Sequence, residues 1–160
     1  MKTLVVYYSM DGNTKFAAEL IARDLSADIM PLEPIKNYPR STIGKYILCG
    51  KAATFGEKPK LKPYLYDPAD YERIIIGTPV WNSRLAAPIN TFLKNSDMKN
   101  KTTSAFFSSA GGDAGKCIAK LNEKLGHMEG TLSLINAKKN EELTQKRVGE
   151  FVDQINACLK

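Results

Sequence analysis

Apolar residues are distributed along the chain in two kinds of segment. Short runs with few polar interruptions, typical of strands buried on both faces, occur at Leu4–Tyr8, around the three isoleucines of Arg73–Pro79, and at Thr102–Ser108. Ser26–Leu32 is a shorter run closed by prolines, and Thr131–Ala137 alternates apolar and polar residues as an edge strand does. This pattern predicts five strands.

Between and after these runs, apolar residues recur every three or four positions, which is the spacing of one helix face. In the first such segment, which follows Asn13, they are Ala17, Leu20, Ile21 and Leu25. The other predicted helices are Ser41 to Phe55, a helix opened by Pro88 with Ile89, Phe92 and Leu93 inside, Lys116 to Leu125 with Cys117, Ile118, Leu121 and Leu125 inside, and one capped by Asn140 with Val148, Phe151, Val152, Ile155 and Leu159 on one side.

Strand–helix pairs therefore repeat five times along the chain. This alternation is typical of an α/β fold in which a parallel sheet is covered by helices on both faces and the crossovers are right-handed. We find no internal repeat and no boundary of a second domain, so residues 1–160 are expected to form a single domain. A chain of 160 residues is long enough to bury a substantial core.

The loop between the first strand and the first helix carries the clearest chemical signal. Its residues are Ser9, Met10, Asp11, Gly12, Asn13 and Thr14. A turn that leads directly into a helix directs free backbone N–H groups and the positive end of the helix dipole at one point, which suits a phosphate dianion. The motif is neither a P-loop nor the three-glycine dinucleotide motif. The alternative is a plain strand–helix connection, since the same residues are common in turns and caps.

Two further loops follow predicted strands at their carboxyl ends, where ligands bind in open parallel sheets. Gly77 to Trp81 is expected to end the third strand, and the loop Thr78 to Arg84 presents the only tryptophan behind Thr78, Pro79 and Val80. The other loop consists of Ser108, Ser109, Ala110, Gly111, Gly112 and Asp113, and its glycines allow the main chain to approach a flat ligand closely. A phosphate site, an aromatic plate and a rim of amides together match an aromatic mononucleotide.

These three motifs, in this order over nearly the whole chain, resemble flavodoxin and the flavodoxin-like flavoproteins. The resemblance rests on Tyr8–Thr14, on Gly77–Trp81 followed by Pro88 and Phe92-Leu93, and on Phe107–Gly112. It implies a three-layer sandwich, a five-stranded sheet of order 2-1-3-4-5, and one non-covalent FMN. By position, Ser9, Asp11, Gly12, Asn13 and Thr14 would bind the phosphate. Thr78, Pro79, Val80 and Trp81 would lie along the isoalloxazine, and Ser108 to Asp113 would close over it.

The chemistry in that case belongs to the flavin, and no side chain need act as acid or base. Main-chain groups of Val80, Trp81 and Asn82 are candidates to bond the flavin N5 edge. Those of Gly111 and Gly112 are candidates for the pyrimidine side. Arg84 would add positive charge near the ring or would lie at the surface.

Three departures from the family pattern bear on function. Asp11 stands where the family usually has Thr, the third loop lacks the aromatic that commonly covers the outer flavin face, and the net charge is +6 where carrier flavodoxins are strongly acidic. The missing aromatic and the basic charge favour an FMN-dependent oxidoreductase that passes electrons from a nicotinamide or protein donor to a quinone-like or other acceptor. The alternative is an electron carrier that docks on partner proteins. A cofactor-free receiver domain would need an acidic cluster, and only Asp11 and Asp113 lie near the strand ends.

Composition narrows the remaining classes of function. The chain is 43% hydrophobic and 25% charged, and no apolar run is long enough to cross a membrane, so we expect a cytoplasmic protein. Cys49, Cys117 and Cys158 are widely spaced, which predicts reduced thiols rather than a zinc site, and the single His127 is expected in an exposed loop. Basic residues are scattered along the chain, which disfavours nucleic-acid binding. Gly56–Pro63, which is spaced by prolines and lysines, is expected to be an exposed linker.

Overall fold

The fold is built around a parallel sheet of five strands. The computed structural model describes residues 1–36, 38, 49, 51 and 56–158. Its sheet has the order β2-β1-β3-β5-β6. In chain order, the strands are β1 Thr3–Tyr7, β2 Asp28–Pro31, β3 Arg73–Trp81, β4 Arg84–Leu85, β5 Thr102–Ser109 and β6 Thr131–Ile135. With β4 set aside, this is the order 2-1-3-4-5 that the resemblance implied. The predicted fold class is therefore confirmed.

The register places the strand centres side by side. Val5 of β1 pairs with Ile29 on one side and with Ile75 on the other, and Ile75 in turn pairs with Ser104 of β5. All of these pairs are parallel, whereas the two-residue β4 returns antiparallel beside the end of β3. Because every parallel strand runs the same way, their carboxyl ends form one edge of the sheet, here called the carboxyl edge.

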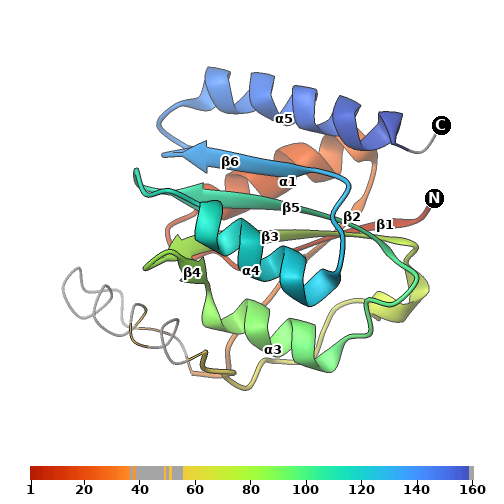
Figure 1. The fold of residues 1–160 in the computed structure, drawn as a ribbon, viewed down its shortest axis with the longest axis vertical. Helices are drawn as coiled ribbons and strands as arrows, with labels where there is room; N and C mark the ends of the chain where they lie inside the picture. The colour runs from red at the N-terminus through yellow and green to blue at the C-terminus, as the bar shows by residue number, and fades with distance from the viewer. Residues whose placement is uncertain (37, 39–48, 50, 52–55, 159–160) are drawn as a thin grey trace.

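Helices cover both faces of the sheet. Figure 1 shows α1 (Asn13–Leu25) and α5 (Glu141–Ala157) on one face, and α3 (Ala87–Asn95) and α4 (Gly115–Leu125) on the other. A short 3-10 helix, η1 (Pro68–Asp70), precedes β3. The helix predicted from Ser41 to Phe55 lies outside the described residues, apart from Cys49 and Lys51.

Two apolar cores follow from the alternation of side chains along the strands. Val5, Ile75 and Phe106 face α1 and α5, whereas Ile76 and Phe107 belong to the core on the α3 and α4 side. All five side chains are almost completely buried. A central parallel strand is covered on both faces, which is why these strands read as unbroken apolar runs in the sequence.

Gly77 does not end β3, so the prediction that the strand breaks at Gly77 to Trp81 was wrong. The strand continues to Trp81 and turns back into β4. A Cβ atom on Gly77 would lie 2.2 Å from Cζ of Phe106. The glycine is therefore required by the close packing of a neighbouring ring, and it interrupts the apolar pattern without interrupting the strand.

Other details refine the predictions. Asn140 precedes α5 as expected, but its side-chain amide donates to the carbonyl of Ile135 at 3.0 Å and does not cap the helix. Cys49 and Cys117 are buried free thiols, whereas Cys158 and His127 are exposed. Leu159 lies outside the described residues. Among the described residues, no helix is both long and apolar enough to cross a membrane.

Candidate functional site

The turn between β1 and α1 presents unpaired backbone donors. Gly12 adopts a left-handed conformation (φ 86°) immediately before the helix, and its N–H donates to Oγ of Ser9 at 3.1 Å. The amides of Asn13, Thr14 and Lys15 lie in the first helical turn and have no helical acceptor. They also donate to no other group in the described part of the chain. The positive end of α1 therefore faces the carboxyl edge of the sheet.

A buried contact between two hydroxyl groups joins the first turn of α1 to the end of β5, because Ser108 and Ser109 of the predicted third loop belong to this strand. Oγ1 of Thr14 and Oγ of Ser108 are 2.6 Å apart, and both residues are at least 97% buried. The two residues are 94 positions apart in sequence, so only the parallel topology brings them together. The structure thus places the first and third predicted loops against each other.

The third loop offers exposed main chain. Oγ of Ser109 donates to the carbonyl of Gly112 at 3.0 Å, which closes the loop on itself. Ala110, Gly111 and Gly112 are exposed, and the φ of 142° at Gly111 is one that glycine adopts without strain. Oδ1 of Asp113 accepts from the N–H of Gly115 at the start of α4, so this carboxylate orders the helix start.

The second loop is a tight hairpin whose turn residues are Asn82 and Ser83. Their φ angles of 49° and 57° correspond to the left-handed pair of a type I′ turn. The turn pairs Trp81 with Arg84. The hydroxyl of the buried Thr78 accepts from the N–H of Ala86 at 3.2 Å and donates to the carbonyl of Pro79 at 2.9 Å. This hydroxyl thus stabilises the hairpin, and its hydrogen is already donated to the carbonyl of Pro79.

Trp81 packs edge-on against two tyrosines. Its ring centroid lies 5.5 Å from that of Tyr8 and 5.2 Å from that of Tyr38, and its residue is 8% exposed. Burial raises the pKa of Tyr38 to about 12 and also raises the pKa of Tyr8, so both phenols stay neutral at physiological pH. Tyr8 directly precedes the β1–α1 turn, so this aromatic cluster connects the second loop to the first. Sequence reasoning missed the two tyrosines as partners of Trp81.

A fourth loop, residues 136–140 between β6 and α5, also reaches the site. The N–H of Asn136 donates to the carbonyl of Ser109 at 2.9 Å, and the N–H of Lys138 donates to Oδ1 of Asn13 at 3.0 Å. The loop therefore contacts both the first and the third loops. The sequence motifs did not point to this loop, although two adjacent lysines after an edge strand were a usable signal.

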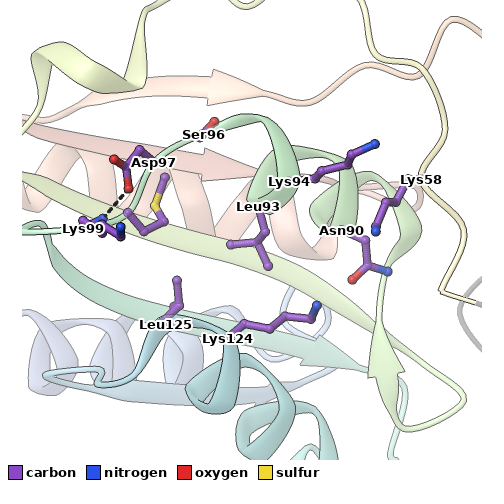
Figure 2. A pocket seen from close by; sticks show the side chains of 10 residues that line it. Lys58, Asn90, Leu93, Lys94, Ser96, Asp97, Lys99, Lys124 and Leu125 are labelled. Atoms are coloured by element: carbon purple, nitrogen blue, oxygen red, sulfur yellow. Dashed lines mark hydrogen bonds between the residues drawn. The ribbon is translucent and has the colours of Figure 1, made fainter.

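A separate hollow of about 470 Å³ lies between α3 and α4. Figure 2 shows Asn90, Leu93 and Lys124 pointing into it from the two helices, and the backbone N–H of Lys99 bonded to Asp97. Much of its lining comes from the ends of these helices, near the amino ends of the next strands. This hollow, here called the α3–α4 groove, is thus distinct from the loop cluster. Its residues are Lys58, Asn90, Leu93, Lys94, Ser96, Asp97, Met98, Lys99, Lys124 and Leu125.

Solved structures with the same fold include several flavoproteins. A flavoprotein from Lactobacillus acidophilus NCFM, crystallised in complex with FMN, is 26% identical with a TM-score of 0.71, covering 88% of this chain and 97% of that one. A protein from Bacteroides uniformis is 24% identical with a TM-score of 0.76, covering 92% and 97%. Oxidised flavodoxin 2 from Bacillus cereus is 19% identical with a TM-score of 0.64, covering 98% and 99%.

Sequence comparison gives the family directly. No match is found among curated proteins. The family model described as flavodoxin matches residues 2–155, which is nearly the full length of the chain. Together with the sheet order, this match shows that the chain belongs to the flavodoxin family.

Proposed function

We propose that the protein binds one FMN non-covalently at the carboxyl edge and acts as an oxidoreductase. The observation that carries the proposal is the contact between the hydroxyls of Thr14 and Ser108 beside the unpaired amides of α1. This contact holds a donor-rich turn and a glycine-bearing loop together at one place. The flavoprotein from Lactobacillus acidophilus, which shares the fold, is in complex with FMN.

The phosphate fits the β1–α1 turn on chemical grounds. The amides of Asn13, Thr14 and Lys15 supply three N–H donors, and the helix dipole adds partial positive charge. Ser9 already accepts from Gly12, so its own hydroxyl hydrogen remains to be donated outward. Asp11 lies two residues after this serine and is exposed. We propose that its carboxylate is directed away from the dianion.

The ring system would lie between the β3–β4 hairpin and the loop of Ser109 to Asp113. The bound flavin would supply the redox chemistry, whereas the protein would position it. The main chain of Val80, Trp81 and Asn82 would orient one edge of the ring. The exposed amides of Gly111 and Gly112 would donate to the opposite, pyrimidine edge. The neutral tyrosines beside Trp81 add no charge to this region at neutral pH.

An enzyme is favoured over a pure electron carrier by two features. The exposed residues of the third loop are Ala110, Gly111, Gly112 and Asp113, so no aromatic side chain of this loop would cover the outer ring face. The net charge of +6 also differs from the acidic surface that helps carrier flavodoxins to dock on basic partners. We therefore propose transfer from a nicotinamide or protein donor to a quinone-like acceptor, in the cytoplasm.

The test has two stages. The purified protein is examined for a yellow flavin spectrum, and the cofactor released on denaturation is identified as FMN or another flavin. Oxidation of NADH and NADPH is then measured with a soluble benzoquinone as acceptor. Steady turnover supports the enzyme. Bound FMN without turnover, together with electron delivery to a protein acceptor, supports the carrier. A protein that takes up no added FMN refutes the proposal.

A further inference from the structure

Lys138 lies over the phosphate turn, although it is 125 residues away from Asn13 in sequence. A Cβ atom on Gly12 would be 3.4 Å from Cδ of Lys138 and 3.6 Å from its Nζ. The side chain therefore covers Gly12, and the ammonium group lies close to this residue, which immediately precedes the first turn of α1. No residue of the three predicted loops contributes a cation at this position.

The backbone of Lys138 is held from several directions. Its N–H donates to Oδ1 of Asn13 at 3.0 Å, so the loop is bonded directly to the phosphate turn. The preceding Ala137 is fully buried, and its carbonyl accepts from Oγ1 of Thr144 in α5 at 3.0 Å. The lysine is therefore presented by a fixed loop, and only its side chain has to adjust to a ligand.

The electrostatic setting of this lysine is unfavourable without an anion. The first turn of α1 contains no acidic residue, whereas the first turn of α5 contains Glu141 and Glu142. A cation beside the positive end of a helix is repelled by the helix dipole. Lys138 forms no salt bridge with any described residue, and the exposed Asp11 is the only carboxylate in the adjoining turn.

We infer that Lys138 is a ligand of the FMN phosphate and makes the site select FMN over riboflavin, an inference that rests on the proposed function. Its ammonium would complete a cradle otherwise made of neutral amides and hydroxyls. Riboflavin has the same ring and ribityl chain but no phosphate. Loss of Lys138 should therefore weaken FMN binding and leave riboflavin binding unchanged.

The test is to titrate the apoprotein with FMN and with riboflavin and to measure binding by the quenching of flavin fluorescence. Lys138→Met keeps the aliphatic stem over Gly12 but removes the charge, and it should raise the Kd for FMN about 10-fold or more. Lys138→Arg should keep most of the affinity. Lys139→Met is the matched control, because Lys139 is the exposed neighbour in the same loop, and its Kd should stay within about 2-fold of wild type.

The ionic strength of the buffer provides a second readout. Added salt should weaken FMN binding more in the wild type than in Lys138→Met, because salt screens the ammonium–phosphate attraction. An unchanged Kd for FMN in Lys138→Met overturns the inference, as does equal weakening of FMN and riboflavin, which would indicate a structural role. If wild-type apoprotein binds riboflavin as tightly as FMN, the inference fails although flavin binding stands. If it binds neither, the proposed function itself fails.

Discussion

Two regions of the molecule present lysine side chains, and they differ in what surrounds the positive charge. The α3–α4 groove has Lys58, Lys94, Lys99 and Lys124 along its wall, whereas the loop cluster at the carboxyl edge has Lys138 beside the phosphate turn. By count of charges the groove looks like the better anion site. The unpaired backbone amides at the start of α1 instead favour the loop cluster as the anion site.

Two of the four groove lysines have a structural explanation. Lys94 is in the last turn of α3 and Lys124 in the last turn of α4, where cations stabilise the negative end of the helix dipole. Lys138 lies instead beside the positive end of α1, in whose first turn no acidic residue occurs. A lysine therefore indicates an anion-binding site only where its charge does not already stabilise the end of a helix.

Gly12→Glu should have the largest effect on this comparison. The new side chain would be strained at φ 86°, would meet Lys138 at 3.4 Å, and would place a carboxylate where the phosphate is proposed to bind. We expect FMN affinity to fall by about 100-fold or more, measured by flavin fluorescence. Gly126→Glu is the matched control, because Gly126 has a similar φ of 82° at the other end of the molecule with open space around it. Undiminished flavin binding by the Gly12 variant would refute the assigned cradle.

Thr14→Val should have an intermediate effect. It removes the hydroxyl bonded to Ser108 while keeping the shape of the side chain, and it leaves a buried hydroxyl without its partner. We expect a loss of about 1–3 kcal/mol in the free energy of unfolding and about 10-fold weaker FMN binding. Thr103→Val removes a partly buried hydrogen bond to the carbonyl of His127 at the start of β5, and should lower stability without changing the Kd. Equal Kd changes in both variants would mean that the Thr14–Ser108 contact has no special role in the site.

The double variant Lys94→Met/Lys124→Met should have the smallest effect. Both lysines line the groove in Figure 2, and both are exposed. We expect the Kd for FMN to stay within about 2-fold of wild type. The free energy of unfolding should fall by about 0.3–1 kcal/mol for each lysine, because each helix loses a favourable charge at its end. This is measured by thermal and urea denaturation. A marked loss of FMN affinity would indicate that the phosphate binds in the groove and not in the loop cluster.

Much of the fold was predictable because strands buried on both faces leave a plain signal. Arg73–Pro79 and Thr102–Ser108 were recognised as strands from apolar runs alone, and the strand order came from the resemblance. The exception is instructive. Gly77 looks like a strand end in sequence, but it lies within β3 because the ring of Phe106 occupies the space of a Cβ atom.

The candidate site was only partly visible. Loops that carry glycine and hydroxyl residues next to strands are conspicuous, so Ser9–Thr14 and Ser108–Asp113 were selected. Lys138 and Tyr38 were not, since an exposed lysine after an edge strand and a tyrosine in a polar stretch are each common. Their importance depends on which distant residue they contact.

By itself, the sequence determined which segments become buried strands, where helices begin, and which loops can present backbone donors, because periodicity and turn chemistry act over a few residues. Only the tertiary structure decided that Thr14 meets Ser108, that Tyr8 and Tyr38 enclose Trp81, and that Lys138 covers Gly12. These contacts join residues far apart in the chain. They form only when the parallel register brings every strand's carboxyl end to the same edge of the sheet.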